Sequence, residues 1–157
     1  MNHFFRWIPC AALALLAGCA STRPVVQAEA AAPAPVLMVS IDGFRADYLD
    51  RGISPTLSAL ASEGVRAQAM EPSFPSLTFP NHYTLVTGRY PDKHGIVDNA
   101  MFDPTLGSFT LGNRQAVGDG RWWNEAEPIW VTAEKQGLHT ATMFWPGSEA
   151  AIHGVRP

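Results

Sequence analysis

The segment VLMVSIDG, residues Val36–Gly43, is the stretch that most constrains the fold. Its first six residues form an apolar run, as expected of a strand that is buried on both faces in a parallel sheet. Two further segments, Val65–Met70 and Leu138–Phe144, also read as strands. Because predicted helices separate the strands, the pattern favours an α/β layered fold with a parallel sheet.

Proline and glycine mark the boundaries of three predicted helices. Proline fits the first turn of a helix, and glycine is common just past its end. The predicted helices begin at Ser54-Pro55, Pro80 and Pro128, and end at Gly64, Gly88 and Gly137. Residues 89–127 contain many Gly, Asp and Asn residues, so a long irregular stretch is expected there.

Composition excludes several classes of site. The chain has 157 residues with 11 basic and 14 acidic side chains, a net charge of -3. This balance gives no electrostatic footprint for a nucleic-acid backbone, so no duplex binding is expected. Both cysteines, Cys10 and Cys19, lie in the first twenty residues. The rest of the chain therefore has no disulfide, no thiolate zinc site and no cysteine nucleophile.

The N-terminus reads as a targeting segment. An apolar run, Trp7–Leu16, follows Arg6 and is shorter than the about 20 residues that span a bilayer, as in a secretory signal. Leu16-Ala17-Gly18-Cys19 resembles the bacterial lipobox, which implies a signal peptide over residues 1–18 and a lipid on Cys19. The alternative is an ordinary signal peptide with an unrelated cysteine.

Residues 19–35 are rich in Ala and Pro and are expected to act as a tether between the lipidated Cys19 and a folded domain over residues 36–157. Ala20 follows the cysteine, and by the same resemblance this implies the outer membrane. The expected location is therefore the bacterial cell envelope, lipid-anchored and facing the periplasm.

Two side chains suggest phosphoryl-transfer chemistry. Asp42 follows the first predicted strand, the side on which open α/β sheets bind ligands, and its carboxylate suits a cation such as zinc. Thr78 lies just ahead of the helix at Pro80, whose free amides and positive dipole end suit a phosphate. A metal could activate its hydroxyl as a nucleophile. Taken singly, Asp42-Gly43 also fits a plain turn and Thr78 a helix cap.

Four further residues are weaker candidates. The Asn99 amide could donate to a charged oxygen in a transition state, or Asn99 could simply occupy a turn. Phe79 adjoins Thr78 and could stack on a substrate. His82 and His94 lack a partner at metal-ligand spacing, and His82 is expected to be packed or bonded to backbone within its helix.

These motifs together resemble the nucleotide pyrophosphatase/phosphodiesterase family, the type I phosphodiesterases of the alkaline phosphatase superfamily. The resemblance covers residues 36–157. The segments that carry it are SIDGFR (40–45), PSLTFPNHY (75–83), LVTG (85–88), YP (90–91), HGI (94–96), DN (98–99), EPIW (127–130) and FWPGS (144–148).

The resemblance implies an α/β fold, namely an alkaline-phosphatase-like parallel-sheet core with helices on both faces, incomplete in this chain. It implies metal-dependent hydrolysis of phosphodiester or pyrophosphate bonds in nucleotide-type substrates, with two zinc ions. By the same resemblance, Asp42 and Thr78 would ligate one zinc and Thr78 would attack phosphorus. Asn99 would bind substrate and stabilise developing charge, and Phe79 would face the base or leaving group.

The family completes its zinc sites with Asp and His ligands that are expected beyond Pro157. Residues 36–157 would then be the N-terminal part of the domain, and the chain alone is predicted to be inactive or nearly so. Two alternatives stay open. One is a phosphomonoesterase or phosphonate hydrolase of the same superfamily, and the other is a non-catalytic envelope lipoprotein fragment.

Overall fold

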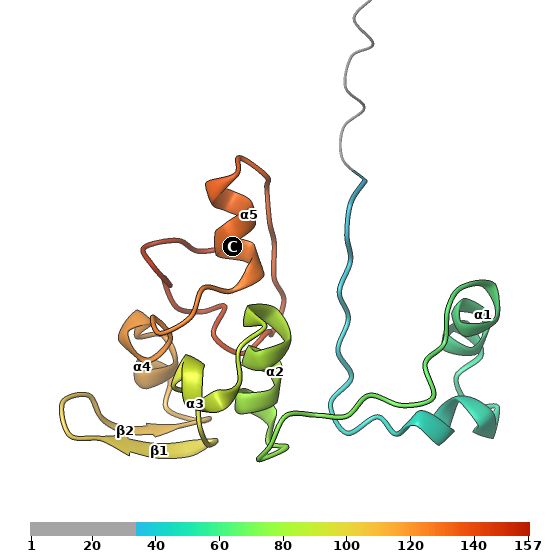
Figure 1. Ribbon diagram of the computed structural model, residues 1–157, viewed down its shortest axis with the longest axis horizontal. Helices are drawn as coiled ribbons and strands as arrows, with labels where there is room; N and C mark the ends of the chain where they lie inside the picture. Colours follow the sequence, from blue (N-terminus) through green and yellow to red (C-terminus); the bar gives the residue numbers. More distant parts are fainter. Residues whose placement is uncertain (1–33) are drawn as a thin grey trace, which may run out of the picture. The chain divides into compact units, whose positions relative to one another are not determined.

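The computed structural model describes residues 34–157. The chain divides into two units, Met1–Val39 and Ser40–Pro157. Residues 34–39 of the first unit are exposed and have no regular structure, and the second unit carries all the described helices and strands (Figure 1). The predicted signal peptide (1–18), the lipidated Cys19 and the tether up to residue 33 lie outside the described residues. Within residues 34–157, no helix has the length and apolar character needed to cross a membrane.

Helix α2 (Thr78–Thr87) is the element on which the candidate site depends. It packs against the short helix α3 (Pro91–His94), which lies beside it in Figure 1. Gly88 ends α2 in the left-handed conformation, at a φ of 65°, and donates its N–H to the Thr84 carbonyl. A glycine at this position avoids the strain that a side chain would meet at positive φ.

A small antiparallel hairpin follows α3. Strands β1 (Ala100–Asp103) and β2 (Gly107–Thr110) pair with Met101 opposite Phe109. Helix α4 (Arg114–Val117) packs against β2, and the 3-10 helix η2 (Gly120–Trp122) comes next. The prediction of one irregular stretch over residues 89–127 was therefore wrong. Strands and helices of three or four residues are too short to show a hydrophobic period, so the sequence pattern does not reveal them.

Aromatic side chains form the centre of the core. The Trp123 ring is fully buried, and its centroid lies 5.0 Å from that of Tyr83 and 5.9 Å from that of Phe109. The Tyr83 hydroxyl lies within hydrogen-bonding distance of the Trp123 and Ala126 carbonyls. Helix α5 (Ile129–Lys135) adds Trp130 and Val131. Trp122, Trp123 and Trp130 are all buried, so this part of the chain contributes three tryptophans to the core.

The three predicted helices are present. Helix α1 (Pro55–Glu63) follows Ser54, which makes no side-chain cap, and ends at Gly64; the 3-10 helix η1 (Ala46–Arg51) precedes it. Helix α5 follows Pro128 as predicted. Helix α2 begins two residues earlier than predicted, at Thr78. Pro80 is tolerated there because the first intrahelical bond runs from the N–H of the next residue, Asn81, to the Leu77 carbonyl.

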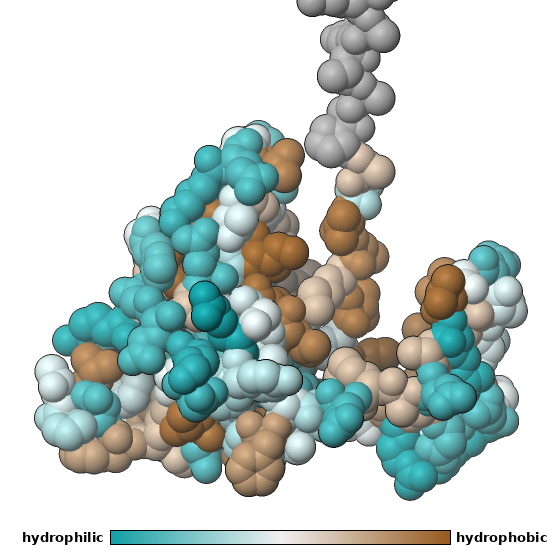
Figure 2. Space-filling view, in the orientation of Figure 1, coloured by the Kyte–Doolittle hydropathy of each residue, from teal (hydrophilic) through white to brown (hydrophobic). Residues whose placement is uncertain are grey.

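The three predicted parallel strands are not formed, which corrects that part of the prediction. Residues 36–41, 65–70 and 138–144 have no strand partner within residues 34–157, where β1–β2 is the one sheet. A strand buried in a parallel sheet needs neighbours to bond its backbone groups and cover its apolar faces. Without them the apolar side chains stay exposed: Val36, Leu37, Val65 and Met143 are all above 80% accessible. Figure 2 shows apolar residues along the extended segment next to the grey trace.

We predict that Gly147→Ala destabilises the fold much more than Gly107→Ala. Both glycines have positive φ, at 90° and 87°, so both variants carry similar backbone strain. An added Cβ meets the buried Trp123 ring at 2.9 Å in Gly147 but meets nothing within 4 Å in Gly107. Overpacking typically costs about 1–3 kcal/mol, which is the expected difference in unfolding free energy between the variants by urea titration. Equal losses in both variants would contradict the packing of this loop against Trp123.

Candidate functional site

The first turn of α2 holds the predicted nucleophile beside the predicted metal ligand. Thr78 is the first residue of the helix, and its hydroxyl donates to Asp42 Oδ2 over 3.0 Å. Asp42 is exposed and Thr78 is half-buried, so both oxygens can reach a ligand. The two residues are 36 positions apart in sequence, and the structure brings them together as predicted.

Asn99 lies at the same end of α2. Its Oδ1 accepts a hydrogen bond from the Phe79 N–H at 2.9 Å. The residue before the helix, Leu77, has no polar side chain, so Asn99 supplies the acceptor that an N-cap side chain would normally provide. A backbone N–H only donates, which assigns the oxygen of the amide to this bond. The Asn99 NH2 group has no acceptor among the described residues.

Phe79 packs inward more than the stacking prediction anticipates. Its half-buried ring lies 5.8 Å from the rings of both Phe109 and Trp123, so it is part of the aromatic core. This contact fixes the residue that follows Thr78. Stacking of Phe79 on a substrate stays a prediction, limited to the side of the ring that the core leaves open.

His82 connects the start of α2, at Thr78, with the segment that carries Ser40 and Asp42. Its Nδ1 lies 2.7 Å from the Thr78 carbonyl and its Nε2 lies 2.8 Å from Ser40 Oγ. The expectation that His82 bonds to backbone is confirmed. The sequence reasoning missed the contact with Ser40. The spacing of Thr78 and His82, four apart on a helix, places both on one face, but it gives no signal for the contact with Ser40.

The described residues do not complete a metal centre. Asp42 and Thr78 bring two oxygen atoms together, whereas catalytic zinc sites use three protein ligands. Within residues 34–157, no three or more His, Asp, Glu or Cys side chains are grouped so that they could hold a metal ion. His94, the other histidine considered, is fully buried and lies 3.0 Å from Thr84 Oγ1 through Nε2. Burial lowers the pKa of His94, which favours its uncharged form in the core.

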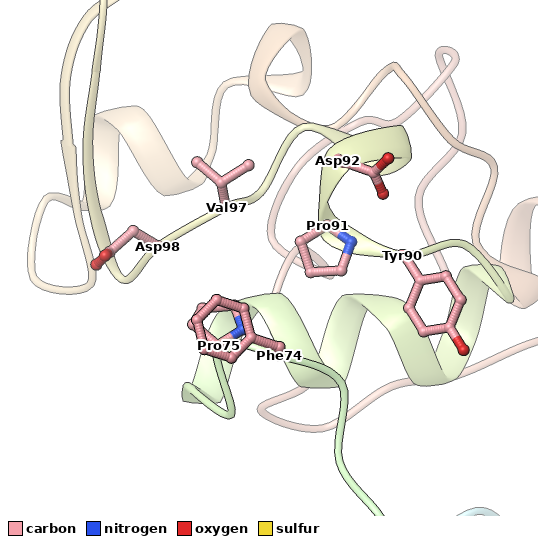
Figure 3. Close-up of a pocket in the computed structure, with 7 residues that line it drawn as sticks. All are labelled: Phe74, Pro75, Tyr90, Pro91, Asp92, Val97 and Asp98. Atoms are coloured by element: carbon pink, nitrogen blue, oxygen red, sulfur yellow. The ribbon is translucent and has the colours of Figure 1, made fainter.

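A surface groove of about 630 Å³ lies next to the site. Its walls come from the segment before α2, the start of α3 and the segment before β1, as Figure 3 shows. Thr78 and Asn99 do not line it, although Pro75 and Asp98 come shortly before them in sequence. The lining residues are Phe74, Pro75, Tyr90, Pro91, Asp92, Val97 and Asp98. In Figure 3 the Asp98 carboxylate points away from Val97 and Pro91, whereas the Asp92 carboxylate lies beside Pro91.

Comparison with known proteins identifies relatives over the whole described domain. The profile of the family described as type I phosphodiesterase / nucleotide pyrophosphatase matches residues 36–157. An uncharacterized pyrophosphatase/phosphodiesterase of Schizosaccharomyces pombe is 51% identical over 123 residues, which are 78% of this chain and 25% of that protein. Human ectonucleotide pyrophosphatase/phosphodiesterase family member 1 is 48% identical over 126 residues, 78% of this chain and 13% of that protein.

Solved structures show the same relationship. Murine ectonucleotide pyrophosphatase/phosphodiesterase 5 superposes with a TM-score of 0.69 at 42% identity, covering 75% of this chain and 32% of that one. An inactive threonine-to-alanine variant of the same murine protein, in complex with AMP, gives the same TM-score at 41% identity. These likenesses confirm the predicted α/β, alkaline-phosphatase-like fold class. The chain spans a third or less of the length of the relatives that it matches.

We predict that Asn99→Ala frees the Phe79 N–H at the start of α2. Loss of a capping acceptor costs about 1 kcal/mol, so the unfolding free energy should fall by that amount and the Phe79 amide should exchange faster with deuterium. Asn99→Asp is the matched control, because it keeps the acceptor and places negative charge at the positive helix end. Similar exchange of the Phe79 amide in wild type and Asn99→Ala would show that Asn99 does not cap the helix.

Proposed function

Because this chain belongs to the type I phosphodiesterase / nucleotide pyrophosphatase family, we propose that it carries the nucleophile of a metal-dependent hydrolase of phosphodiester or pyrophosphate bonds. The observation that carries the proposal is the 3.0 Å hydrogen bond between Thr78 and Asp42 at the first turn of α2. It joins a hydroxyl, a carboxylate and the positive end of a helix, which together suit attack on a phosphate.

In the proposed reaction, Thr78 Oγ1 attacks phosphorus and forms an O–P bond. The bond from phosphorus to the leaving oxygen breaks, and the leaving group departs with the electron pair of that bond. The Thr78 hydroxyl donates to Asp42 Oδ2 before the attack, and its proton passes through solvent to the leaving group. Water then cleaves the phosphoryl- or nucleotidyl-threonine and restores the hydroxyl.

Asn99 is placed to stabilise the charge that develops. Its oxygen is held by the Phe79 N–H, so its NH2 group has a fixed orientation and remains free to donate to a non-bridging oxygen. A donor held in place before the reaction contributes more than one that must reorient, and removal of such a donor costs about 10²–10³ in kcat. Asn99 thereby contributes to substrate binding as well as to catalysis.

We propose zinc as the metal, with Asp42 and Thr78 as two ligands of one of two ions. The adjacent oxygens fit a divalent cation, which when bound lowers the pKa of a ligating hydroxyl and screens the negative phosphate. A working zinc site needs more ligands than the two that Asp42 and Thr78 supply among the described residues. For this reason residues 34–157 alone are proposed to be inactive or nearly so.

The proposed substrates are small nucleotide-type diesters or pyrophosphates. Support comes from the AMP bound to the inactive murine relative and from the names of the other relatives. Phe79 would contact the base or the leaving group. A monoesterase or phosphonate hydrolase with the same nucleophile is the second candidate, because Thr78 and Asp42 would serve either reaction.

We also propose that Cys19 carries a lipid and anchors the protein in a bacterial envelope, in the outer membrane and facing the periplasm. The support is the Leu16–Cys19 segment and the Ala/Pro-rich tether that follows it. The relatives named above come from yeast and mammals, so the anchor rests on the sequence of this chain alone. Labelling cells with a radioactive fatty acid would test it, with Cys19→Ala expected to abolish the label.

We predict that Thr78→Ala abolishes diester turnover in the protein expressed from its native gene, whereas Thr78→Ser keeps a measurable fraction. Alanine removes the attacking oxygen, and serine retains it without the methyl group. The measurement is kcat for a p-nitrophenyl nucleotide diester compared with the matching monoester. Thr105→Ala, an exposed turn position, is the control that should be unchanged. Near-wild-type turnover by Thr78→Ala would exclude Thr78 as the nucleophile.

A second prediction concerns the metal. A chelator should abolish turnover by the natively expressed protein, and added zinc should restore it, because the Thr78 hydroxyl is a poor nucleophile without a cation. Purified residues 20–157 should show little turnover with or without zinc. Asp42 and Thr78 supply two ligands, whereas a catalytic zinc site uses three protein ligands. Robust zinc-dependent turnover by residues 20–157 would overturn the proposal that this segment is inactive by itself.

A further inference from the structure

His82 lies at the centre of a hydrogen-bond chain that runs from Ser40 to Thr78. Nδ1 is 2.7 Å from the Thr78 carbonyl oxygen, and Nε2 is 2.8 Å from Ser40 Oγ. The His82 side chain is almost fully buried, with 6% of the residue accessible. The contact with Ser40 crosses 42 positions of sequence, so it joins two segments that the chain does not hold together locally.

The chemistry of the partners defines the tautomer. A carbonyl oxygen only accepts, so Nδ1 must carry hydrogen and donate to Thr78. In the ring form with one N–H, Nε2 is then the acceptor, and the Ser40 hydroxyl donates to it. Every polar atom of the imidazole is therefore used, and neither nitrogen is available to a metal or a substrate. His82 acts on the site through other residues.

Trp145 makes two more contacts with His82, one with its backbone and one with its ring. The Trp145 indole N–H donates to the His82 carbonyl over 3.2 Å, and the Trp145 ring meets the imidazole edge to face, with centroids 5.4 Å apart. Trp145 belongs to the loop that packs Gly147 against Trp123. The imidazole is therefore anchored to the core, although its two hydrogen bonds point to the site.

We propose that His82 is a positioning residue that sets the separation of Thr78 and Asp42. It does so by binding the backbone of Thr78 and the side chain of Ser40, which is close to Asp42 in sequence. Ser40 lies two residues before Asp42, and Thr78 is the residue whose carbonyl His82 binds. This inference rests on the proposed function, because it assigns His82 to the same Thr78–Asp42 pair. The Thr78–Asp42 hydrogen bond alone joins two short side chains, one of them exposed, and leaves the backbones free to separate.

The test removes the hydrogen bonds between Ser40, His82 and Thr78 one at a time. Ser40→Ala deletes the donor to Nε2 with little change in volume, and Ser62→Ala, an exposed serine that bonds within α1, is the matched control. His82→Asn keeps a donor near the Nδ1 position, and His82→Gln places an amide near Nε2. Loss of a group that orients a functional residue typically costs about 10–100-fold. We expect kcat to fall about 10-fold in Ser40→Ala with KM little changed, and no change in Ser62→Ala.

A spectroscopic readout separates this inference from the proposed function. Nitrogen-15 NMR of the wild-type imidazole should show hydrogen on Nδ1, and Ser40→Ala should shift the Thr78 and Asp42 resonances without unfolding the core. These signals are expected even if the wild type fails to cleave diesters, an outcome that would remove the proposed function alone. Hydrogen on Nε2 in the wild type, or Thr78 and Asp42 resonances as unaffected by Ser40→Ala as by Ser62→Ala, would overturn the positioning role.

Discussion

The start of α2 must obtain its hydrogen-bond partners from distant parts of the chain. Its N-cap position is Leu77, which has no polar side chain, so the exposed N–H groups of the first turn need acceptors from elsewhere. Asn99 provides one for the Phe79 N–H, and Asp42 accepts from the Thr78 hydroxyl. The Asn99 contact satisfies a backbone N–H of the helix, and the Asp42 contact holds the hydroxyl beside it, so the two bring together the groups proposed to carry out phosphoryl transfer.

The aromatic core gives this arrangement its rigidity. Tyr83, one turn after Phe79, is fully buried against Trp123, and Phe79 itself reaches the same cluster. The buried face of helix α2 is thus fixed against the core, and Thr78 in its first turn stays partly accessible. An enzyme that relies on preorganised donors benefits from such a division, because the site needs no rearrangement when charge develops.

Sequence reasoning succeeded where the chemistry is local or encoded in spacing. The starts of α1 and α5 follow from Ser54-Pro55 and Pro128, and the meeting of Asp42 with Thr78 was expected from the family resemblance. It failed for the β1–β2 hairpin, whose four-residue strands show no usable period. It also failed for the predicted parallel strands, since the apolar run at residues 36–41 specifies a strand only when neighbouring strands are present. The Ser40–His82 contact joins residues 42 apart and has no local signature.

The central claim is that Thr78 forms a covalent bond to phosphorus during turnover. The most direct measurement is mass spectrometry of the peptide that contains Thr78, after the natively expressed protein is mixed with a nucleotide diester and quenched in acid. A phosphoryl or nucleotidyl adduct on Thr78, absent from Thr78→Ala, is the predicted result. Turnover of the diester with no adduct on Thr78, or with an adduct on another residue, would contradict the proposed mechanism.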